Sequence, residues 1–289
     1  MRIRRIASKG LDILLALIFV YLLISPRLAA SSTKSALVFC ANSLLPALFV
    51  YTVLSLCLIS SPLIGYLSKR LGNGVIVYLL GLLCGYPIGT RLALSLYKSG
   101  RIDKKHAEYL TSFTNNASLS FVVGFVGGEL LKSVRLGLLL FAYQAISSLI
   151  CAGLMRLYLY RGEKIPKQDA IFTKKASPTE ILFETAQNML NICACVTFYI
   201  VIGDALCEIL DTNALNGAIL KSLLEFSSGA YSASFSPYPF HICALAISFG
   251  GLSVLSQVKS LASGSLSIKP YLWGKLICSC LMMLLCFVG

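Results

Sequence analysis

Apolar runs long enough to cross a lipid bilayer recur along this chain. Five are nearly uninterrupted and cover residues 10–24 (with an extension to 30), 35–59, 134–160, 181–202 and 271–288. A membrane-crossing helix needs about 20 largely apolar residues, and lipid tolerates only helices and closed barrels because their backbone polar groups are satisfied internally. The lengths of these runs favour helices. We therefore expect an all-α, multi-pass membrane protein that contacts the lipid bilayer.

The amino-acid composition excludes most soluble classes. Hydrophobic residues make up 57% of the 289 residues and charged residues only 13%, and the mean hydropathy is +0.80. Soluble domains carry about 25% charged residues, so this chain has too few charges to coat a water-soluble globule. A soluble enzyme, a nucleic-acid binder and a disordered protein are all poor interpretations, and we expect no nucleic-acid partner.

The distribution of charge predicts the topology. The formal net charge is +13, and basic loops are retained on the cytoplasmic side of membranes. Two basic groups stand out, one before the first apolar run and one in the longest polar stretch: Arg2, Arg4, Arg5 and Lys9, and then Arg156, Arg161, Lys164, Lys167, Lys174 and Lys175. We expect both to be cytoplasmic, the N-terminus included. Residues 179–220 contain no Lys or Arg but include Asp204, Glu208 and Asp211, so we expect the end of this segment to be extracytoplasmic.

The first apolar run also has the features of a secretory signal peptide, since a basic segment precedes it and Leu28-Ala29-Ala30 follows. Asp12 interrupts its start and Pro26 follows its end, so we interpret the run as an uncleaved first span.

The eleven cysteines lie mostly in apolar runs without Cys-x-x-Cys spacing, and there are only two histidines. This pattern predicts small hydrophobic side chains with no disulfide framework, metal or cofactor.

Four further apolar runs are interrupted by glycine or polar residues, at 75–97, 117–131, 205–224 and 241–261. Irregular backbone at membrane depth is tolerated only where protein or a water-filled cavity surrounds it. Broken or re-entrant helices at matching places in two halves are typical of a transporter's binding site. The sequence leaves open whether 75–97 and 241–261 span the membrane or re-enter it.

The two halves of the chain resemble one another around these breaks. Placing Gly85 on Gly250, an offset of 165 positions, also places Ser95-Leu96 on Ser260-Leu261 and Lys104 on Lys269. We therefore expect two related, inverted repeats with broken or re-entrant helices. The expected parts are a first membrane half at residues 1–160, a basic cytoplasmic connecting loop at 161–180 and a second membrane half at 181–289.

The richest candidate binding segment lies in the first break. It contains Gly85, Tyr86, Pro87, Gly89, Thr90 and Arg91. Glycine and proline open a helix, helix N-termini attract anions, and the Arg91 guanidinium grips a carboxylate with two parallel hydrogen bonds. Arginine within a bilayer costs about 2.5–3.5 kcal/mol even on a lenient scale, which favours a cavity. The alternative is an arginine that snorkels to the membrane interface.

Other polar residues are candidates for the same site. They are Asn115, Asn116 and Ser118 before an apolar stretch, Asn188 near Glu184 and Asn191, and Gly250, Gly251, Ser253 and Gln257 around the second break. A helix N-cap is the alternative for the Asn115-Asn116 pair, and simple solvation is the alternative for Glu184. No catalytic triad, His-Glu-x-x-His motif or phosphate-binding loop occurs, so we do not expect an enzyme.

Several of these motifs occur together in an order that resembles a known family. They are Asn42-Ser43-Leu44-Leu45-Pro46-Ala47-Leu48-Phe49, Cys84-Gly85-Tyr86-Pro87-Ile88-Gly89-Thr90-Arg91, Leu96-Tyr97-Lys98-Ser99-Gly100, Thr114-Asn115-Asn116-Ala117-Ser118 and the segment from Ser248 to Gln257. From about residue 35 onward the chain resembles sporulation integral membrane proteins of the YlbJ (SpoVV) type. These belong to the nucleoside-recognition, or Gate-domain, superfamily and are similar to concentrative nucleoside transporters.

The resemblance implies a protein of the outer forespore membrane that transports dipicolinate during sporulation. It implies inverted repeats with re-entrant hairpins, and possible partners are a second copy or other sporulation membrane proteins. In this interpretation Arg91, the Asn115-Asn116 pair and the amides near Gly85 and Gly250 bind the carboxylates, while Tyr86 stacks on the ring. Two alternatives stay open: a transporter of nucleosides or other neutral polar solutes, and a non-transporting scaffold or gate subunit in spore assembly.

Overall fold

The computed structural model describes residues 2–59, 61–159, 161 and 177–288, and every regular element in these ranges is helical. The elements are α1 (Arg2–Ile24), α2 (Pro26–Phe39), η1 (Cys40–Leu44), α3 (Leu45–Ile59), α4 (Pro62–Leu71), α5 (Asn73–Cys84), α6 (Ile88–Lys98), α7 (Lys104–Phe113), η2 (Ser120–Leu130), α8 (Val134–Leu159), α9 (Pro178–Ile209), α10 (Ala214–Leu224), α11 (Phe226–Ala233), α12 (Pro239–Phe249), α13 (Gly251–Ala262) and α14 (Lys269–Val288), with η1 and η2 being π-helices. The expected all-α class is confirmed.

The expected multi-pass architecture is also confirmed by helix length and composition. Among the described residues, four helical segments can cross a membrane, and they are Val134–Leu159, Pro178–Ile209, Pro239–Ala262 and Lys269–Val288. Two bent pairs, Asp12–Ile24 with Pro26–Leu44 and Leu48–Leu58 with Pro62–Leu71, raise the number to as many as six. The segment 239–262 therefore qualifies as one span with a break at Gly250. The α5 helix has 12 residues and rises roughly 18 Å, which is short of a bilayer's hydrocarbon thickness.

One expected span is different in the structure. The run at 10–30 is not one helix, because α1 and α2 meet at an angle of 101°. Ser25 separates the two helices, and Pro26 occupies the first turn of α2. Proline has no backbone N–H to donate and disfavours helical geometry in the residue before it, so it starts a helix far better than it continues one.

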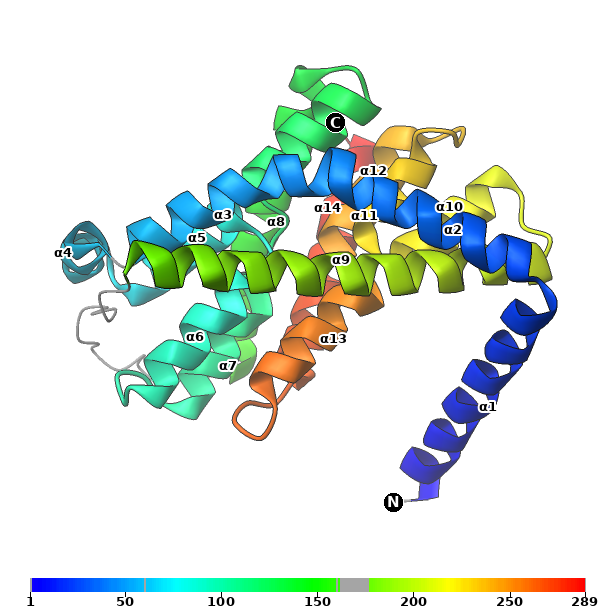
Figure 1. Cartoon of the computed structure of the whole chain (residues 1–289). Coiled ribbons are helices and arrows are strands. Elements are labelled where there is room, and N and C mark those ends of the chain that lie inside the picture. Colours follow the sequence, from blue (N-terminus) through cyan, green and yellow to red (C-terminus); the bar gives the residue numbers. More distant parts are fainter. Residues whose placement is uncertain (1, 60, 160, 162–176, 289) are drawn as a thin grey trace.

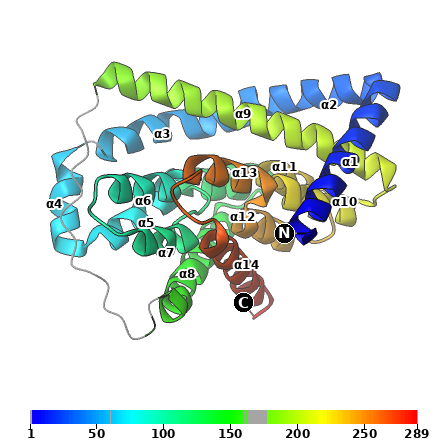
Figure 2. The same cartoon turned by 90° about the horizontal axis from the view of Figure 1, so that it is seen from below.

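The helices form layers (Figures 1 and 2). In Figure 2 the long helix α9 lies beside α2 and α3 along one side of the molecule, α8 and α14 lie on the opposite side, and the short helices α5, α6 and α10–α13 lie between. Packing of α9 against α2 and α3 and of α14 against α7 and α8 agrees with this view. The broken helices are therefore surrounded by other helices, as irregular backbone at membrane depth requires.

The two expected halves contribute jointly to this arrangement, since α14 of the second packs against α7 and α8 of the first. Most of the expected connecting loop at 161–180 lies outside the described residues. At its end, Ser177 and Glu180 form a capping box at the start of α9, which satisfies two backbone donors reciprocally.

Candidate functional site

The two sequence-predicted breaks meet at Tyr86. The first break separates α5 from α6 at Gly85–Pro87, and the second separates α12 from α13 at Gly250. The Tyr86 hydroxyl donates to the Ile247 carbonyl over 2.7 Å. A Cβ at Gly250 would lie 3.2 Å from the Tyr86 ring, and Gly250 has φ +80°. A glycine is therefore needed here for both space and conformation.

A third break meets the same point. The α10 and α11 helices are separated by Glu225 alone, and the neighbouring Phe226 ring lies edge-on to Tyr86 with centroids 5.3 Å apart. A Cβ at Gly251 would lie 2.8 Å from the Leu224 carbonyl oxygen. The breaks of three helix pairs thus surround one tyrosine.

A cavity of about 360 Å³ opens beside this junction. Of the sequence-predicted residues, it is lined by Tyr86, Pro87, Arg91, Asn188 and Gln257, which come from the first break, α6, α9 and α13. Its volume lies in the range of about 300–1,000 Å³ that small-molecule sites occupy. The cavity brings together one cation, three amides (the third from Asn191) and an aromatic ring from three distant parts of the sequence.

The cation of the cavity already has a partner. The Arg91 guanidinium forms an ion pair with the Glu184 carboxylate on α9, and the two side chains are 36% and 35% exposed. Ion pairs with this much exposure are worth about 0.2–1 kcal/mol. An incoming carboxylate can therefore displace Glu184 from Arg91 at a small cost in free energy.

A smaller cavity of about 40 Å³, the inner chamber, shares lining residues such as Tyr86 and Gln257 with the first cavity. Gly85, Ser118 and Glu225 line this chamber, together with Tyr86 and Gln257. The fully buried Glu225 carboxylate accepts hydrogen bonds from the Ser227 amide (3.0 Å), the Ser227 hydroxyl (2.6 Å) and the Ser228 amide (2.6 Å). It caps α11, where a helix N-terminus stabilises negative charge.

The Asn115-Asn116 pair is buried and faces other backbone segments. The Asn115 Oδ1 accepts from the Thr90 amide over 3.0 Å and from the Thr90 hydroxyl over 3.1 Å, and its Nδ2 donates to the Thr111 carbonyl. Asn116 donates to the Phe113 carbonyl. Asn115 thus caps α6 from another part of the chain, and neither asparagine lines the 360 Å³ cavity.

The remaining sequence-predicted residues support the breaks. The Gly85 and Gly250 amides donate to the Gly81 and Ala246 carbonyls. These two amides therefore already have hydrogen-bond acceptors within the fold. A Cβ at Gly89 would overlap Thr114, and the Ser118 hydroxyl accepts from the Phe121 amide over 3.2 Å. The Ser253 hydroxyl is buried and has no hydrogen-bond partner in the part of the chain that the structure describes.

Sequence reasoning missed Lys275, the most buried cation near the site. Its side chain is 4% exposed, and its Nζ donates to the Asn115 carbonyl (2.5 Å), the Tyr86 hydroxyl (2.9 Å) and the Ser248 carbonyl (3.2 Å). It also lies 4.5 Å from the centre of the Tyr86 ring. A lone lysine in the apolar run 271–288 was the available signal, because intramembrane charges are expensive and usually functional.

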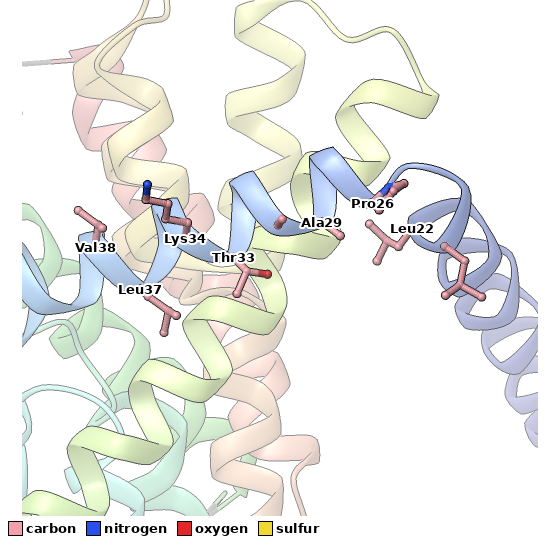
Figure 3. Close-up of a pocket in the computed structure, with 9 residues that line it drawn as sticks. Leu22, Pro26, Ala29, Thr33, Lys34, Leu37 and Val38 are labelled. Carbon is pink, nitrogen blue, oxygen red and sulfur yellow. The ribbon is translucent and has the colours of Figure 1, made fainter.

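A larger groove of about 650 Å³ lies where α1 bends away from α2. Figure 3 shows Lys34 pointing to the opposite side of α2 from Leu37, so the one charged side chain does not converge with other polar groups. A binding site needs a few convergent polar groups in an apolar lining, and this groove lacks them.

No group of three or more His, Cys, Asp or Glu side chains suited to a metal ion occurs in the described ranges.

Comparison with known proteins supports one relationship. The sporulation integral membrane protein YlbJ of Bacillus subtilis (strain 168) is 26% identical over 166 residues, which cover 52% of this chain and 41% of that protein. The chain is distantly related to a sporulation membrane protein. It spans about two-fifths of the length of this curated relative. No protein-family model matches the chain, and no solved structure matches it.

Proposed function

We propose that this chain is a membrane transporter of a small anionic solute, and that an aromatic dicarboxylate such as dipicolinate is its substrate. One observation carries the proposal: Arg91, Asn188 and Gln257 line one cavity at the junction of broken helices. A transporter site formed by discontinuous helices combines such side chains with helix termini. The distant relationship to a sporulation membrane protein supports a role in spore formation.

The chemistry of the lining suits a planar dianion. Arg91 binds one carboxylate through two parallel N–H donors, and the amides of Asn188 and Gln257 donate to the second. Tyr86, Met189 and Ile192 supply the aromatic and apolar contacts. Glu225 lines the inner chamber but not the Arg91 cavity, and three donors compensate its charge, so the dianion binds toward Arg91.

We propose further that the chain is built from two inverted repeats. The order of elements supports this: α5–α6 and α7–η2 precede the long helix α8, as α10–α11 and α12–α13 precede the long helix α14. In this order the Gly85 break corresponds to Glu225, and the Thr114–Ser118 segment corresponds to Gly250. This correspondence differs from the ungapped match of Gly85 with Gly250, which aligns the α5–α6 break with the α12–α13 break.

The proposal places the protein in the outer forespore membrane with its N-terminus in the cytoplasm. The basic residues before the first span and around Arg156 and Arg161 support this orientation. A second copy and other sporulation membrane proteins are the candidate macromolecular partners. The proposal assigns the chain no enzymatic activity, metal or cofactor.

The test is the melting temperature of detergent-purified protein with dipicolinate, phthalate, uridine, adenosine or no addition. A ligand that binds only the folded state stabilises it by RT ln(1 + [L]/Kd), about 2.7 kcal/mol at 100 times the Kd. We expect a concentration-dependent rise with dipicolinate and none with the nucleosides. Arg91→Gln removes the carboxylate grip and abolishes the rise, while Arg135→Gln, a variant of a residue outside the cavity, retains it.

Other outcomes of the panel contradict the proposal in different ways. A rise with uridine or adenosine that Arg91→Gln does not affect assigns the cavity to a neutral solute. No rise with any compound up to millimolar concentration favours the non-transporting scaffold. A dipicolinate rise that survives Arg91→Gln rejects the assignment of Arg91.

A further inference from the structure

The long helix α9 carries two acidic residues that lie a membrane thickness apart. Glu184 and Asp204 are 20 positions apart (204 − 184), which corresponds to a rise of roughly 30 Å along a helix. The hydrocarbon core of a bilayer is also about 30 Å thick. When α9, itself a candidate membrane span, crosses a bilayer along its axis, these two carboxylates lie near opposite faces of the membrane.

Each carboxylate is paired with a cation from a different broken helix pair. Glu184 pairs with Arg91 of α6. Asp204 pairs with Lys221 of α10 over 2.5 Å, and both side chains are 22% exposed. Lys221 therefore lies near the C-terminal end of α9, and Arg91 lies near its N-terminal end.

A second cavity surrounds the Lys221–Asp204 pair. It has a volume of about 710 Å³ and is lined by both members of the pair and by polar side chains that include Asn42, Asn213, Ser228 and Tyr231. Like the first cavity, it offers one cation, amide groups and a tyrosine. A small anion that leaves the Arg91 cavity therefore meets similar chemistry here.

The two cavities are separate. None of the residues that line the 710 Å³ cavity lines the 360 Å³ cavity or its inner chamber. Ser228 lines the second cavity and donates its amide to Glu225, which lines the inner chamber. The first turn of α11 therefore lies between the second cavity and the inner chamber.

We propose that the Lys221–Asp204 cavity is the second vestibule of one translocation route along α9, and that it binds the same small anion as the Arg91 cavity. The first turn of α11 closes the route between the vestibules, and the Lys221–Asp204 pair holds α10 and α11 in the closed position. This inference rests on the proposed transport function. By the distribution of basic residues, the Arg91 cavity faces the cytoplasm and the Lys221 cavity faces the opposite side.

Two native cysteines report on the two cavities. Cys195 lines the first cavity and Cys207 lines the second, and both are partly exposed free thiols. The experiment treats right-side-out and inside-out vesicles with a membrane-impermeant sulfonated maleimide and identifies the labelled peptides by mass spectrometry. Cys195→Ser and Cys207→Ser are the matched controls, and denatured protein gives the maximum labelling.

We expect the reagent to label Cys195 from the cytoplasmic face only and Cys207 from the opposite face only. Dipicolinate should slow the labelling of both thiols at least severalfold. Labelling of both thiols from the same face contradicts the route. The route is also contradicted if both thiols react in the denatured protein but neither reacts in folded protein from either face. Labelling from opposite faces without any effect of dipicolinate retains the route and rejects the substrate.

The role of the ion pair is tested in the same vesicles. Lys221→Gln should let reagent applied to the Cys207 face reach Cys195, and Asp204→Asn should do the same through the other partner. Lys132→Gln is the matched control, because the Lys132–Glu129 pair is loose at 3.9 Å and highly exposed. If both variants melt normally and Cys195 stays closed to that face, the ion pair does not hold the barrier.

Failure of the vestibule and failure of the proposed function give different results. If dipicolinate raises the melting temperature but both thiols are labelled from one face, the Arg91 site is retained and the second vestibule is rejected. Opposite-face labelling in a protein that no solute stabilises keeps the route and rejects the dicarboxylate assignment.

Discussion

At the scale of the residue, Lys275 shows how a membrane protein accommodates a buried charge. Its ammonium donates to two backbone carbonyls and one hydroxyl, which uses all three of its N–H groups. The carbonyl acceptors, Asn115 and Ser248, lie beside breaks where helical hydrogen bonding is incomplete. The lysine thus joins the α7–η2, α5–α6 and α12–α13 breaks.

We predict that Lys275→Met lowers the free energy of unfolding by about 1–3 kcal/mol, the penalty for leaving a buried polar group unsatisfied. Methionine fills a similar volume, so the loss reports hydrogen bonding rather than packing. The measurement is the thermal melting temperature in detergent, with the exposed Lys259→Met as control. A Lys275→Met protein as stable as the control would show that the lysine does not hold the breaks together.

Asn115 carries the second prediction at this scale. Asn115→Ala removes the cap from the Thr90 amide and should lower the free energy of unfolding by about 0.5–2 kcal/mol. Because the side chain does not line the cavity, the dipicolinate-dependent rise in melting temperature should persist. A stable variant that has lost this rise would instead assign Asn115 to the ligand.

Glu184 carries the third prediction. Glu184→Gln frees Arg91 from its ion pair and should tighten dipicolinate binding roughly 1.5- to 5-fold, as expected for a pair worth about 0.2–1 kcal/mol. Titration of the ligand-dependent melting temperature measures the change, with Glu129→Gln as the control. Weaker binding in Glu184→Gln would mean that Glu184 positions Arg91 and does not compete with the substrate.

Sequence reasoning identifies some residues of the candidate site better than others. Arg91 and Gln257 are polar residues close to glycine-rich breaks, and that proximity alone brings them into consideration. Whether Asn115 faces a ligand or caps a distant helix depends on the tertiary position of Thr90. Glu225 is missed because a single acid after an apolar run resembles a helix end until its burial is known.

At the scale of the element, glycines set how closely helices approach. A Cβ at Gly274 on α14 would overlap the Ser112 carbonyl of α7. Gly127 of η2 and Gly137 of α8 approach similarly, and a Cβ at Gly127 would lie 2.6 Å from the Gly137 Cα. Small residues at helix contacts are how membrane helices pack without a hydrophobic driving force.

We predict that Gly274→Ala separates α14 from α7 and lowers the free energy of unfolding by about 1–3 kcal/mol, the range for overpacking. Gly153→Ala on α8 is the matched control, since a Cβ there meets nothing within 4 Å. Alanine also raises helix propensity, so the control should be neutral or slightly stabilising. Equal melting temperatures for the two variants would contradict the close packing of α14 on α7.

Hydropathy predicts where the long helices lie, but it predicts their irregular segments less well. The long helices α8, α9 and α14 agree with apolar runs in the sequence to within a few residues at most of their ends. The run 117–131 shows its glycines but not that residues 120–130 form a π-helix. Such local geometry depends on contacts such as those of η2 with α8, which a single sequence does not display.

At the scale of the whole molecule, apolar side chains cover the outer surface and polar groups lie in the interior. Large apolar side chains such as Phe183, Leu190 and Phe287 are 67–73% exposed, as expected for a surface that lipid covers. Polar groups collect inside, along α9 and the breaks. The composition predicts this division, whereas the convergence of three breaks on Tyr86 depends on the tertiary arrangement.

Uptake by proteoliposomes is the most direct test of anion transport through the Arg91 cavity. Purified protein is reconstituted, and entry of labelled dipicolinate is followed over time against protein-free liposomes and against Arg91→Gln. We expect saturable uptake by the native protein, which unlabelled phthalate slows, and uptake by Arg91→Gln at the protein-free rate. Native uptake at the protein-free rate, or full uptake by Arg91→Gln, would contradict a carboxylate-transporting cavity.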